Sequence, residues 1–306
     1  MMIMGCDFHP SWQQVSWLDT ETGETGEQKL VQASGDAAQI RASYVRQQKT
    51  DQRDAAHILK LLIEGRFPRI WMPSSEVRDL RQLLLHRYKL VIIRARVKNE
   101  LQHLCLNKGV QRKRKLWSQA GQQILRELPL QLWAGRRRDD LLKLMAMLDQ
   151  QIEPLDQAVK AEAQRDKMAL LLQTQPGVGA ITALAYVLTM GDVGRFPRGK
   201  QVASYLGLIP REHSSGGRQK LGAITKQGNR MLRMLLVEAA QIAVRYDPEF
   251  RREYLHRCHQ KPKAVAKVAA ARKLAVRLYW MLRTQRPYPA VVRIESSPRV
   301  PLVGAS

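Results

Sequence analysis

Residues 46–57 read RQQKTDQRDAAH and place Asp51 and Asp54 three positions apart among cationic and polar side chains. From Asp51 to Glu64 the apolar residues follow helical spacing, which predicts a helix beginning near Asp51. One interpretation of the two acids is a capped helix start, because an aspartate there satisfies free N–H groups and the helix dipole. The other is part of a divalent-metal site, because carboxylates at i and i+3 share one helix face.

Upstream of this stretch, residues 2–8, 12–18 and 28–33 predict three short strands, with a Gly/Thr-rich turn at 20–27. Asp7 ends the first strand. An acid there, followed by a hairpin of two further strands, is typical of the start of an RNase H-like α/β fold. Carboxylates are ligands that Mg²⁺ accepts, and paired metals can hold the attacking and leaving oxygens of a phosphodiester.

Downstream, a helical run without Pro or Gly extends from Ser74 or Ser75 to Gly109, which corresponds to roughly 50 Å of helix. A basic loop at 111–117 follows, and a second helical pattern runs from about 138 to 172, with Pro154 as a point of bending. These two patterns predict an antiparallel coiled-coil arm. The alternative is two ordinary core helices, and the length favours the arm.

The composition changes again at residue 173. An apolar helix is expected at 181–188, a Ser/Gly-rich loop after Pro210, a basic helix from about Thr225, and two further helices at 248–260 and 263–283. The last residues, rich in proline, are expected to form a mobile tail. We therefore predict four parts, which are an α/β domain at 1–73, the arm at 74–172, a mostly α-helical domain at 173–284 and the tail at 285–306.

The charge of the chain restricts its partners. Its 306 residues are 44% hydrophobic and carry 51 Lys and Arg against 27 acids, a net charge of +24. This excess favours nucleic acid over an acidic membrane surface. No apolar run reaches the roughly 20 residues that span a bilayer. Cys6, Cys105 and Cys258 are widely spaced without a CxxC pair, so we expect neither a disulfide framework nor a cysteine zinc site, and a cytoplasmic location.

Two segments of the helical domain are candidates for phosphate contact. Gly177 and Gly179, in QPGVG, precede a helix whose N–H groups could bind a phosphate, although a tight turn that needs glycine gives the same pattern. Ser215 lies in SSGG, where a serine can act as a nucleophile if its proton is removed. The alternative is a polar loop with solvated serines. The candidate phosphate-binding cations around that loop are Arg211, Arg218, Lys220, Lys226, Arg230 and Arg233.

Several motifs in this order resemble one family. They are GCDFH (5–9), RQQKTDQRDAAHI (46–58), QPGVGAITA (175–183) and YLGLIPREHSSGGRQKLGAITKQGNRMLRMLLVEAA (205–240). The resemblance, which extends to about residue 285, is to insertion-sequence transposases of the family 110 type. These are bridge-RNA-guided recombinases with an N-terminal DEDD RuvC-like domain and a C-terminal serine transposase domain.

The resemblance implies a role for each candidate. Asp7 corresponds to the first acid of a Mg²⁺-binding tetrad, Asp51 and Asp54 to the last two, and Ser215 to the nucleophile that forms a phosphoserine link with DNA. It further implies a noncoding RNA that pairs with donor and target DNA, a composite site between protomers, and dimers or tetramers.

The sequence departs from the family pattern at one point. The second acid of the tetrad, a glutamate on a central strand, has no counterpart, and Asp7 and Asp51 are only 44 positions apart. A strand, a helix and a further strand need roughly 25–40 residues by mean element lengths, so the pattern implies an internal deletion between Gly35 and Asp36. Three functions follow as hypotheses, which are a transposase, a nucleic-acid-binding remnant that does no chemistry, and a RuvC-like structure-specific nuclease.

Overall fold

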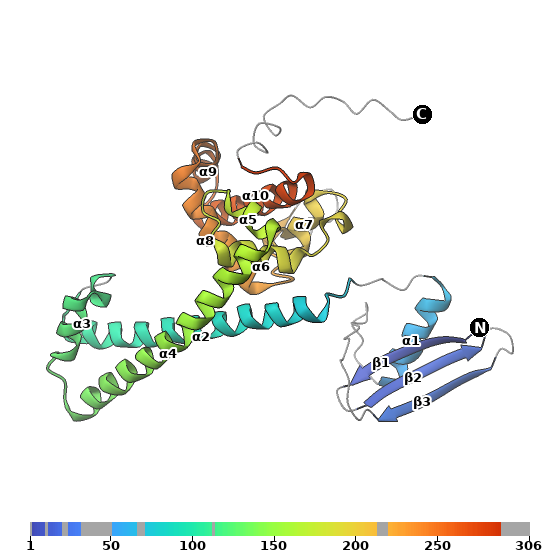
Figure 1. Cartoon of the computed structure of the whole chain (residues 1–306), viewed down its shortest axis with the longest axis horizontal. Coiled ribbons are helices and arrows are strands. Elements are labelled where there is room, and N and C mark those ends of the chain that lie inside the picture. The colour runs from blue at the N-terminus through green and yellow to red at the C-terminus, as the bar shows by residue number, and fades with distance from the viewer. Residues whose placement is uncertain are drawn as a thin grey trace. The chain divides into compact units, whose positions relative to one another are not determined.

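The structure is a computed structural model, and it describes residues 2–9, 12–19, 24–31, 51–65, 71–111, 114–212 and 220–288. The described elements are mostly helices, with two small sheets (Figure 1). The chain divides into two compact units, Met1–Met72 and Pro73–Ser306, each of which is described by itself.

The first unit is a three-stranded antiparallel sheet with one helix. Strands β1 (Met2–His9), β2 (Trp12–Asp19) and β3 (Thr25–Val31) follow one another in sheet order. Helix α1 (Asp51–Ile63) packs on β1 and β2. Its buried residues are Ala55, Ile58 and Leu59, which follow the spacing that predicted it.

The third strand begins at Thr25, three residues earlier than the sequence predicts. Residues 25–27, which were predicted to belong to a turn, are therefore part of the sheet. Gly26 pairs with Trp17 of β2, and a Cβ atom at Gly26 would lie 2.1 Å from Cζ2 of that indole. The glycine that indicated a turn is needed because the tryptophan ring covers its backbone. The junction between Gly35 and Asp36 lies outside the described residues.

The second unit contains two long helices that lie side by side (Figure 1). They are α2 (Ser75–Asn107), capped by Ser74, and α4 (Leu132–Arg165), which contains Pro154. Ion pairs join Arg87 to Asp156, Arg94 to Asp149 and Glu100 to Arg137. Because the numbers rise along one helix as they fall along the other, the two helices are antiparallel. Their shared core contains Leu90, Val97, Leu101, Leu104, Met145, Leu148 and Ile152.

A short 3₁₀ turn (Arg114–Trp117) and helix α3 (Gln119–Arg126) connect the far ends of α2 and α4. Residues 111–117 were expected to be a basic loop. Leu116 and Leu125 are fully buried and extend the core between the long helices. The turn is therefore ordered by its apolar residues, although its composition is basic.

The second long helix differs from its expected range of about 138 to 172. It begins at Leu132 and ends at Arg165, and a separate helix, α5 (Lys167–Gln173), follows. Asp166 causes the break. Its backbone is extended, with ψ of 109°, and its side chain accepts hydrogen bonds from the N–H groups of Met168 and Ala169. An aspartate that caps the next helix ends the previous one, which helical periodicity does not reveal.

The remaining helices form a bundle around a second core. They are α6 (Ala180–Met190), α7 (Gly199–Tyr205), α8 (Arg230–Tyr246), α9 (Pro248–Gln260) and α10 (Lys263–Thr284), with a 3₁₀ turn at Val193–Arg195. The helices expected at 248–260 and 263–283 are confirmed. Within the described ranges, the structure contains no helix long and apolar enough to cross a membrane.

Helix α6 lies in the middle of this bundle. The hydroxyl group of Tyr186 is fully buried and donates a 2.6 Å hydrogen bond to the carbonyl of Ala275 on α10. Arg81 of α2 reaches the same helix, where its Nε and Nη2 atoms donate to the carbonyl of Leu188 at 3.1 and 2.6 Å. The bundle and the pair of long helices are thus joined through polar contacts as well as apolar packing.

Candidate nucleic-acid interface

A two-stranded hairpin holds the serine loop of the sequence motif. Strands β4 (Pro210–Glu212) and β5 (Leu221–Ile224) are antiparallel, with Pro210 opposite Ile224 and Glu212 opposite Leu221. The predicted nucleophile Ser215 and the predicted cation Arg218 lie between these strands, at 213–219, outside the described residues. The structure describes the two strands on either side of these residues and the segments that lead into and out of them, which we call the base of the loop.

Two glycines interlock at this base. Gly207 has φ of +65°, and a Cβ atom there would lie 2.3 Å from the carbonyl oxygen of Gln227. Gly228 has φ of +70°, and a Cβ atom there would lie 2.3 Å from the carbonyl oxygen of Tyr205. The segments before β4 and after β5 therefore cross backbone to backbone, at a distance that a side chain would prevent. The motifs YLGLIP and ITKQGN meet at this crossing.

Arg233 fastens the two segments together. Its Nη1 atom donates to the carbonyls of Leu206, at 3.3 Å, and of Gln227. Burial lowers the pKa of this guanidinium, and the nearby charge of Arg230 adds to the effect. Arg233 was predicted to contact DNA, and the structure shows that part of its hydrogen-bonding capacity holds the base of the loop.

The expected basic helix from about Thr225 begins instead at Arg230. Residues 225–229 form the turn after β5, in which Lys226 has φ of +58° and Gly228 is also left-handed. Asn229 caps α8 by accepting a 3.1 Å hydrogen bond from the N–H of Leu232, and its amide donates to Thr189 of α6. Two left-handed residues cannot continue a right-handed helix, which sets the start of α8.

Four predicted cations are exposed around this base. Arg211 lies in β4, Lys220 precedes β5, Lys226 lies in the turn and Arg230 is the first residue of α8. The fold brings all four to the two ends of one short hairpin and its connection to α8. Such a grouping of positive charge suits a phosphate backbone.

The QPGVG segment forms the turn between α5 and α6. Gly177 has φ of +87°, and a Cβ atom there would lie 2.3 Å from the carbonyl oxygen of Ala239 and 2.8 Å from the nitrogen of Ala243. The first glycine is thus required for packing on α8. Gly179 is exposed and precedes α6 without a side-chain cap, so the amides at the start of that helix remain candidates for phosphate contact.

The predicted acids lie in the first unit. Asp7 is in β1, in register with Gln14 of β2, Asp51 is the first residue of α1, and Asp54 lies one turn later with a half-buried side chain. The side chains of Asp7 and Asp51 lie outside the described residues. Among the side chains that are described, no group of three or more His, Cys, Asp or Glu could hold a metal ion.

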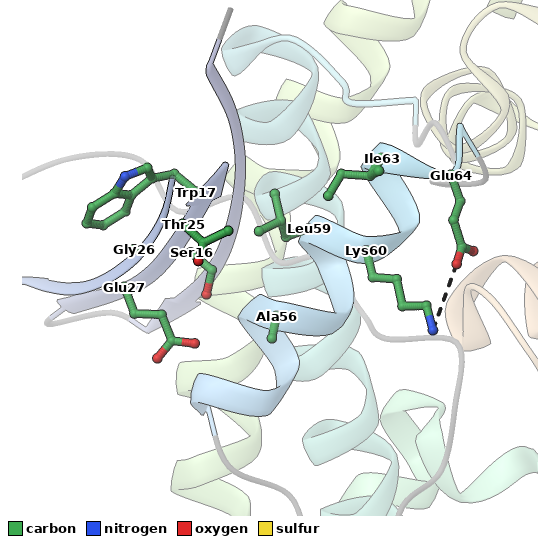
Figure 2. Close-up of a pocket in the computed structure, with 10 residues that line it drawn as sticks. All are labelled: Ser16, Trp17, Thr25, Gly26, Glu27, Ala56, Leu59, Lys60, Ile63 and Glu64. Carbon is green, nitrogen blue, oxygen red and sulfur yellow. Dashed lines mark ion pairs between the residues drawn. The ribbon is translucent and has the colours of Figure 1, made fainter. Parts of the chain in front are cut away.

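A groove of about 530 Å³ lies between α1 and the strands β2 and β3 (Figure 2). It is lined along α1 from Ala56 to Glu64, and Lys60 and Glu64 form an i,i+4 ion pair at 3.9 Å. Trp17 and Glu27 line it from the sheet. Asp54, the predicted acid whose side chain the structure describes, is not among its lining residues.

Comparison with known proteins identifies the family. The sequence profile of the "Transposase IS116/IS110/IS902 family" matches residues 169–255, and a transposase profile of the DEDD type of IS110 elements matches residues 24–108. A probable family 20 transposase of Pseudomonas aeruginosa is 31% identical over 257 residues, covering 80% of this chain and 75% of the relative. The chain belongs to the IS110-type family of insertion-sequence transposases.

Other relatives differ in length and in described role. The transposase for insertion sequence element IS1111A of Coxiella burnetii is 31% identical over 212 residues, and the match covers 66% of this chain but only 57% of that protein. The pilin gene-inverting protein of Moraxella bovis is 28% identical over 248 residues, covering 78% of this chain and 68% of the relative.

The matched segments contain most of the predicted site residues. Asp51 and Asp54 lie within 24–108, whereas Asp7 precedes that segment. Ser215, both glycines and the six cations lie within 169–255. Sequence reasoning did not assign roles to Gly207, Gly228 and Asn229, although all three stand in the quoted motif. The glycine at 228 followed by the helix-capping Asn229 was the sequence pattern that could have predicted a left-handed turn and the start of a helix there.

Proposed function

We propose that this chain is a DNA transposase or site-specific recombinase that cuts and rejoins DNA through Ser215. The observation that carries the proposal is the hairpin base, where interlocked glycines hold together the two segments that flank residues 213–219 and exposed cations lie on those segments, within a stretch that matches the transposase family. The names of two relatives, an insertion-sequence transposase and a pilin gene-inverting protein, support the same class of reaction.

The chemistry assigns one task to each residue. The hydroxyl oxygen of Ser215 attacks a phosphodiester phosphorus and its proton passes to a base, so that a serine–phosphate bond forms and the bond to one deoxyribose oxygen breaks. That deoxyribose leaves as a free hydroxyl end. A hydroxyl end of the second DNA then attacks the phosphoserine and releases the serine. Arg211, Lys220, Lys226 and Arg230 would hold the phosphate oxygens as charge develops on them.

The predicted acidic residues are of a type that can bind a divalent cation. Asp7, Asp51 and Asp54 are carboxylates, which Mg²⁺ accepts, and the helix that bears the last two packs on the strand that bears the first. When bound, Mg²⁺ would neutralise charge on a phosphate oxygen. These three residues are proposed to form the acidic site of a RuvC-like domain, and α2 with α4 are proposed to form a coiled-coil arm, which precedes the serine domain in the sequence.

RNA guidance is part of the same proposal. A noncoding RNA that pairs with donor and target DNA would read their sequences, so that the protein needs mainly phosphate contacts, in keeping with a net charge of +24. A homodimer would bring two serine loops, and a tetramer four, to the two DNA partners.

The second candidate function is a catalytically impaired remnant that binds nucleic acid. It is favoured by one observation, which is that only 19 positions separate the end of β3 at Val31 from the start of α1 at Asp51. That interval is too short for the strand, helix and strand that would carry the tetrad glutamate. A RuvC-like structure-specific nuclease is less well supported, because a nuclease that uses only metals has no need for the serine loop.

The experiment is a search for a covalent protein–DNA product. The purified chain is incubated with Mg²⁺, an RNA transcribed from the flanking element and both DNA partners, and the products are separated under denaturing conditions. We expect an adduct that disappears in Ser215→Ala and persists in Ser214→Ala. Cleavage without an adduct, unchanged in Ser215→Ala, would indicate the nuclease, and binding without either product would indicate the remnant.

A further inference from the structure

A second groove lies between the hairpin and the last two helices. It has a volume of about 880 Å³ and is bounded by all four residues of β5 and by one side of α10. Much of its lining is aliphatic, including Leu221 and Val265, which are 53% and 52% exposed. The other aliphatic lining residues are Leu208, Pro210, Ala223, Ile224, Ala264, Val268, Ala269 and Val276. We call this feature the hairpin groove.

Cations also line the hairpin groove, and the described residues that line it include no acid. Arg257 and Lys261 contribute from α9 and the turn after it, and Arg272 and Lys273 from α10. Lys273 is paired with Glu253. Arg257, Lys261 and Arg272 form no ion pair with any residue that the structure describes. Three positive charges therefore line the groove with no carboxylate partner among the residues that the structure describes.

The arginines of the long helices show the contrast. Arg136, Arg137 and Arg138 are consecutive, yet each forms an ion pair, with Asp140, Glu100 and Asp139 respectively. Their charges are balanced within the protein. The segment 248–273 instead contains eight Lys and Arg and only two acids. Concentrated cations without local acids attract a polyanion and release counterions when it binds.

We propose that the hairpin groove holds one sugar–phosphate strand of a DNA duplex. Arg257, Lys261 and Arg272 would contact phosphates, and the aliphatic lining residues would contact deoxyribose carbons. This inference rests on the proposed function and adds the path of the DNA, because β5, which leads out of the serine loop, forms one wall. A strand in the groove would lie against β5, which follows the serine-containing segment in the chain.

The length of the groove agrees with a short stretch of backbone. From Lys263 to Arg272 helix α10 rises about 14 Å. A DNA strand rises 3.4 Å per nucleotide, so roughly four nucleotides lie alongside this part of the helix. Three cations over roughly four nucleotides correspond to slightly less than one contact for each phosphate of the strand. Arg257, Lys261 and Arg272 all follow residue 255, where the matched family segment ends, so the family match does not account for them.

The test compares two variants of equal net charge in the full chain. The groove variant is Arg257→Gln, Lys261→Gln and Arg272→Gln, and the control is Lys89→Gln, Lys143→Gln and Lys160→Gln, all exposed on the long helices. Binding to a 30-base-pair duplex is measured by fluorescence anisotropy over a range of salt concentrations. We expect the groove variant to lower the slope of log affinity against log salt by about 2.7, because each lost duplex phosphate contact removes about 0.9. The control should lower it by less than about 1.

A third variant tests occupancy without changing charge. Val265→Trp fills the groove from an exposed position and should weaken duplex binding about fivefold or more while the salt slope stays the same, because only the ionic contacts determine that slope. A groove variant whose salt slope equals that of the control would overturn the proposal. The proposal would also be overturned if the groove variant lost affinity for an RNA hairpin but kept its affinity for duplex DNA, since the groove would then be an RNA site.

These results are separable from those for the serine chemistry. Ser215→Ala should bind duplex with the wild-type salt slope, because it removes no cation. If the wild-type chain forms no covalent adduct but the groove variant lowers the slope, the groove assignment stands and the proposed catalysis fails. If the adduct forms and the slope is unchanged, the catalysis stands and the groove assignment fails.

Discussion

Arg277 of α10 and Asp247, which joins α8 to α9, form an ion pair in the core of the helical bundle. Nη1 of the arginine donates a 2.7 Å hydrogen bond to Oδ2 of the aspartate, and the two side chains are 0% and 2% exposed. The other carboxylate oxygen caps α9 by accepting from the N–H of Phe250. The guanidinium also lies over the Phe250 ring, 5.2 Å from its centroid. One carboxylate thus fixes the corner between α8 and α9 against α10.

We predict that Asp247→Ala lowers the free energy of unfolding by about 3–5 kcal/mol, because it removes the carboxylate that pairs with the buried Arg277 charge. Urea denaturation followed by circular dichroism measures the change. Glu162→Ala is the matched control, since it breaks an ion pair with Arg165 whose side chains are 30% and 77% exposed, and should change stability by less than about 1 kcal/mol. Equal effects of the two substitutions would contradict this account.

The two glycines of QPGVG should respond differently to alanine. Gly177→Ala is expected to reduce stability by more than about 2 kcal/mol, because it combines an unfavourable positive φ with a collision against α8. Gly179→Ala should reduce it by less than about 1 kcal/mol, because that position is exposed with φ of −89°. Thermal denaturation of both variants provides the comparison. A stable Gly177→Ala variant that loses only DNA affinity would show that the glycine serves phosphate contact instead.

Lys226 separates a backbone effect from a charge effect. Lys226→Gly and Lys226→Ala remove the same cation, but only glycine accepts φ of +58° without strain. We expect the glycine variant to be more stable than the alanine variant by about 1 kcal/mol. Affinity for duplex DNA should fall equally in both if the charge matters and the strain does not. Chemical denaturation and anisotropy titrations measure the two quantities, and unequal affinities would link the strained turn to binding.

Tyr186 should contribute to stability in a pH-dependent way. Burial raises the pKa of its hydroxyl well above 10, with a smaller contribution from Tyr279. Above pH 10 the unfolded chain releases this proton while the folded protein keeps it, so the stability is complete below pH 10 and declines as the pH rises further. The free energy of unfolding of Tyr186→Phe should therefore fall less than that of the wild type between pH 9 and 11. At pH 9 it should be about 1 kcal/mol lower than that of the wild type, because the hydrogen bond to Ala275 is lost.

The control for this prediction is Tyr246→Phe, since Tyr246 is 72% exposed. Its alkaline denaturation profile should match that of the wild type. If Tyr186→Phe also gave the wild-type profile, ionisation of the buried hydroxyl would not be the cause of any alkaline loss. Midpoints of urea unfolding at a series of pH values suffice for the comparison.

Much of the secondary structure follows from local pattern. The apolar spacing after Asp51 predicted α1, and Ser74 with an uninterrupted run of helix formers predicted α2. The misplaced boundaries have a shared cause. Asp166 ends one helix by capping the next, and Gly26 looks like a turn residue although Trp17 packs on it. In each case the decisive partner is another residue's backbone or ring, which periodicity does not record.

Some features of the candidate site also follow from local sequence, whereas others depend on tertiary contacts. The sequence by itself determined the charge of +24, the cations around the serine loop and the spacing of Asp51 and Asp54, because composition and short motifs are properties of the chain. Only the tertiary structure decided that Gly207 and Gly228 interlock, that Arg233 joins the two segments at the hairpin base and that β5 and α10 border a groove lined by cations without an ion pair among the described residues. Each of these depends on segments that are distant in the chain, and their close approach is set by the packing of α6, α8 and α10.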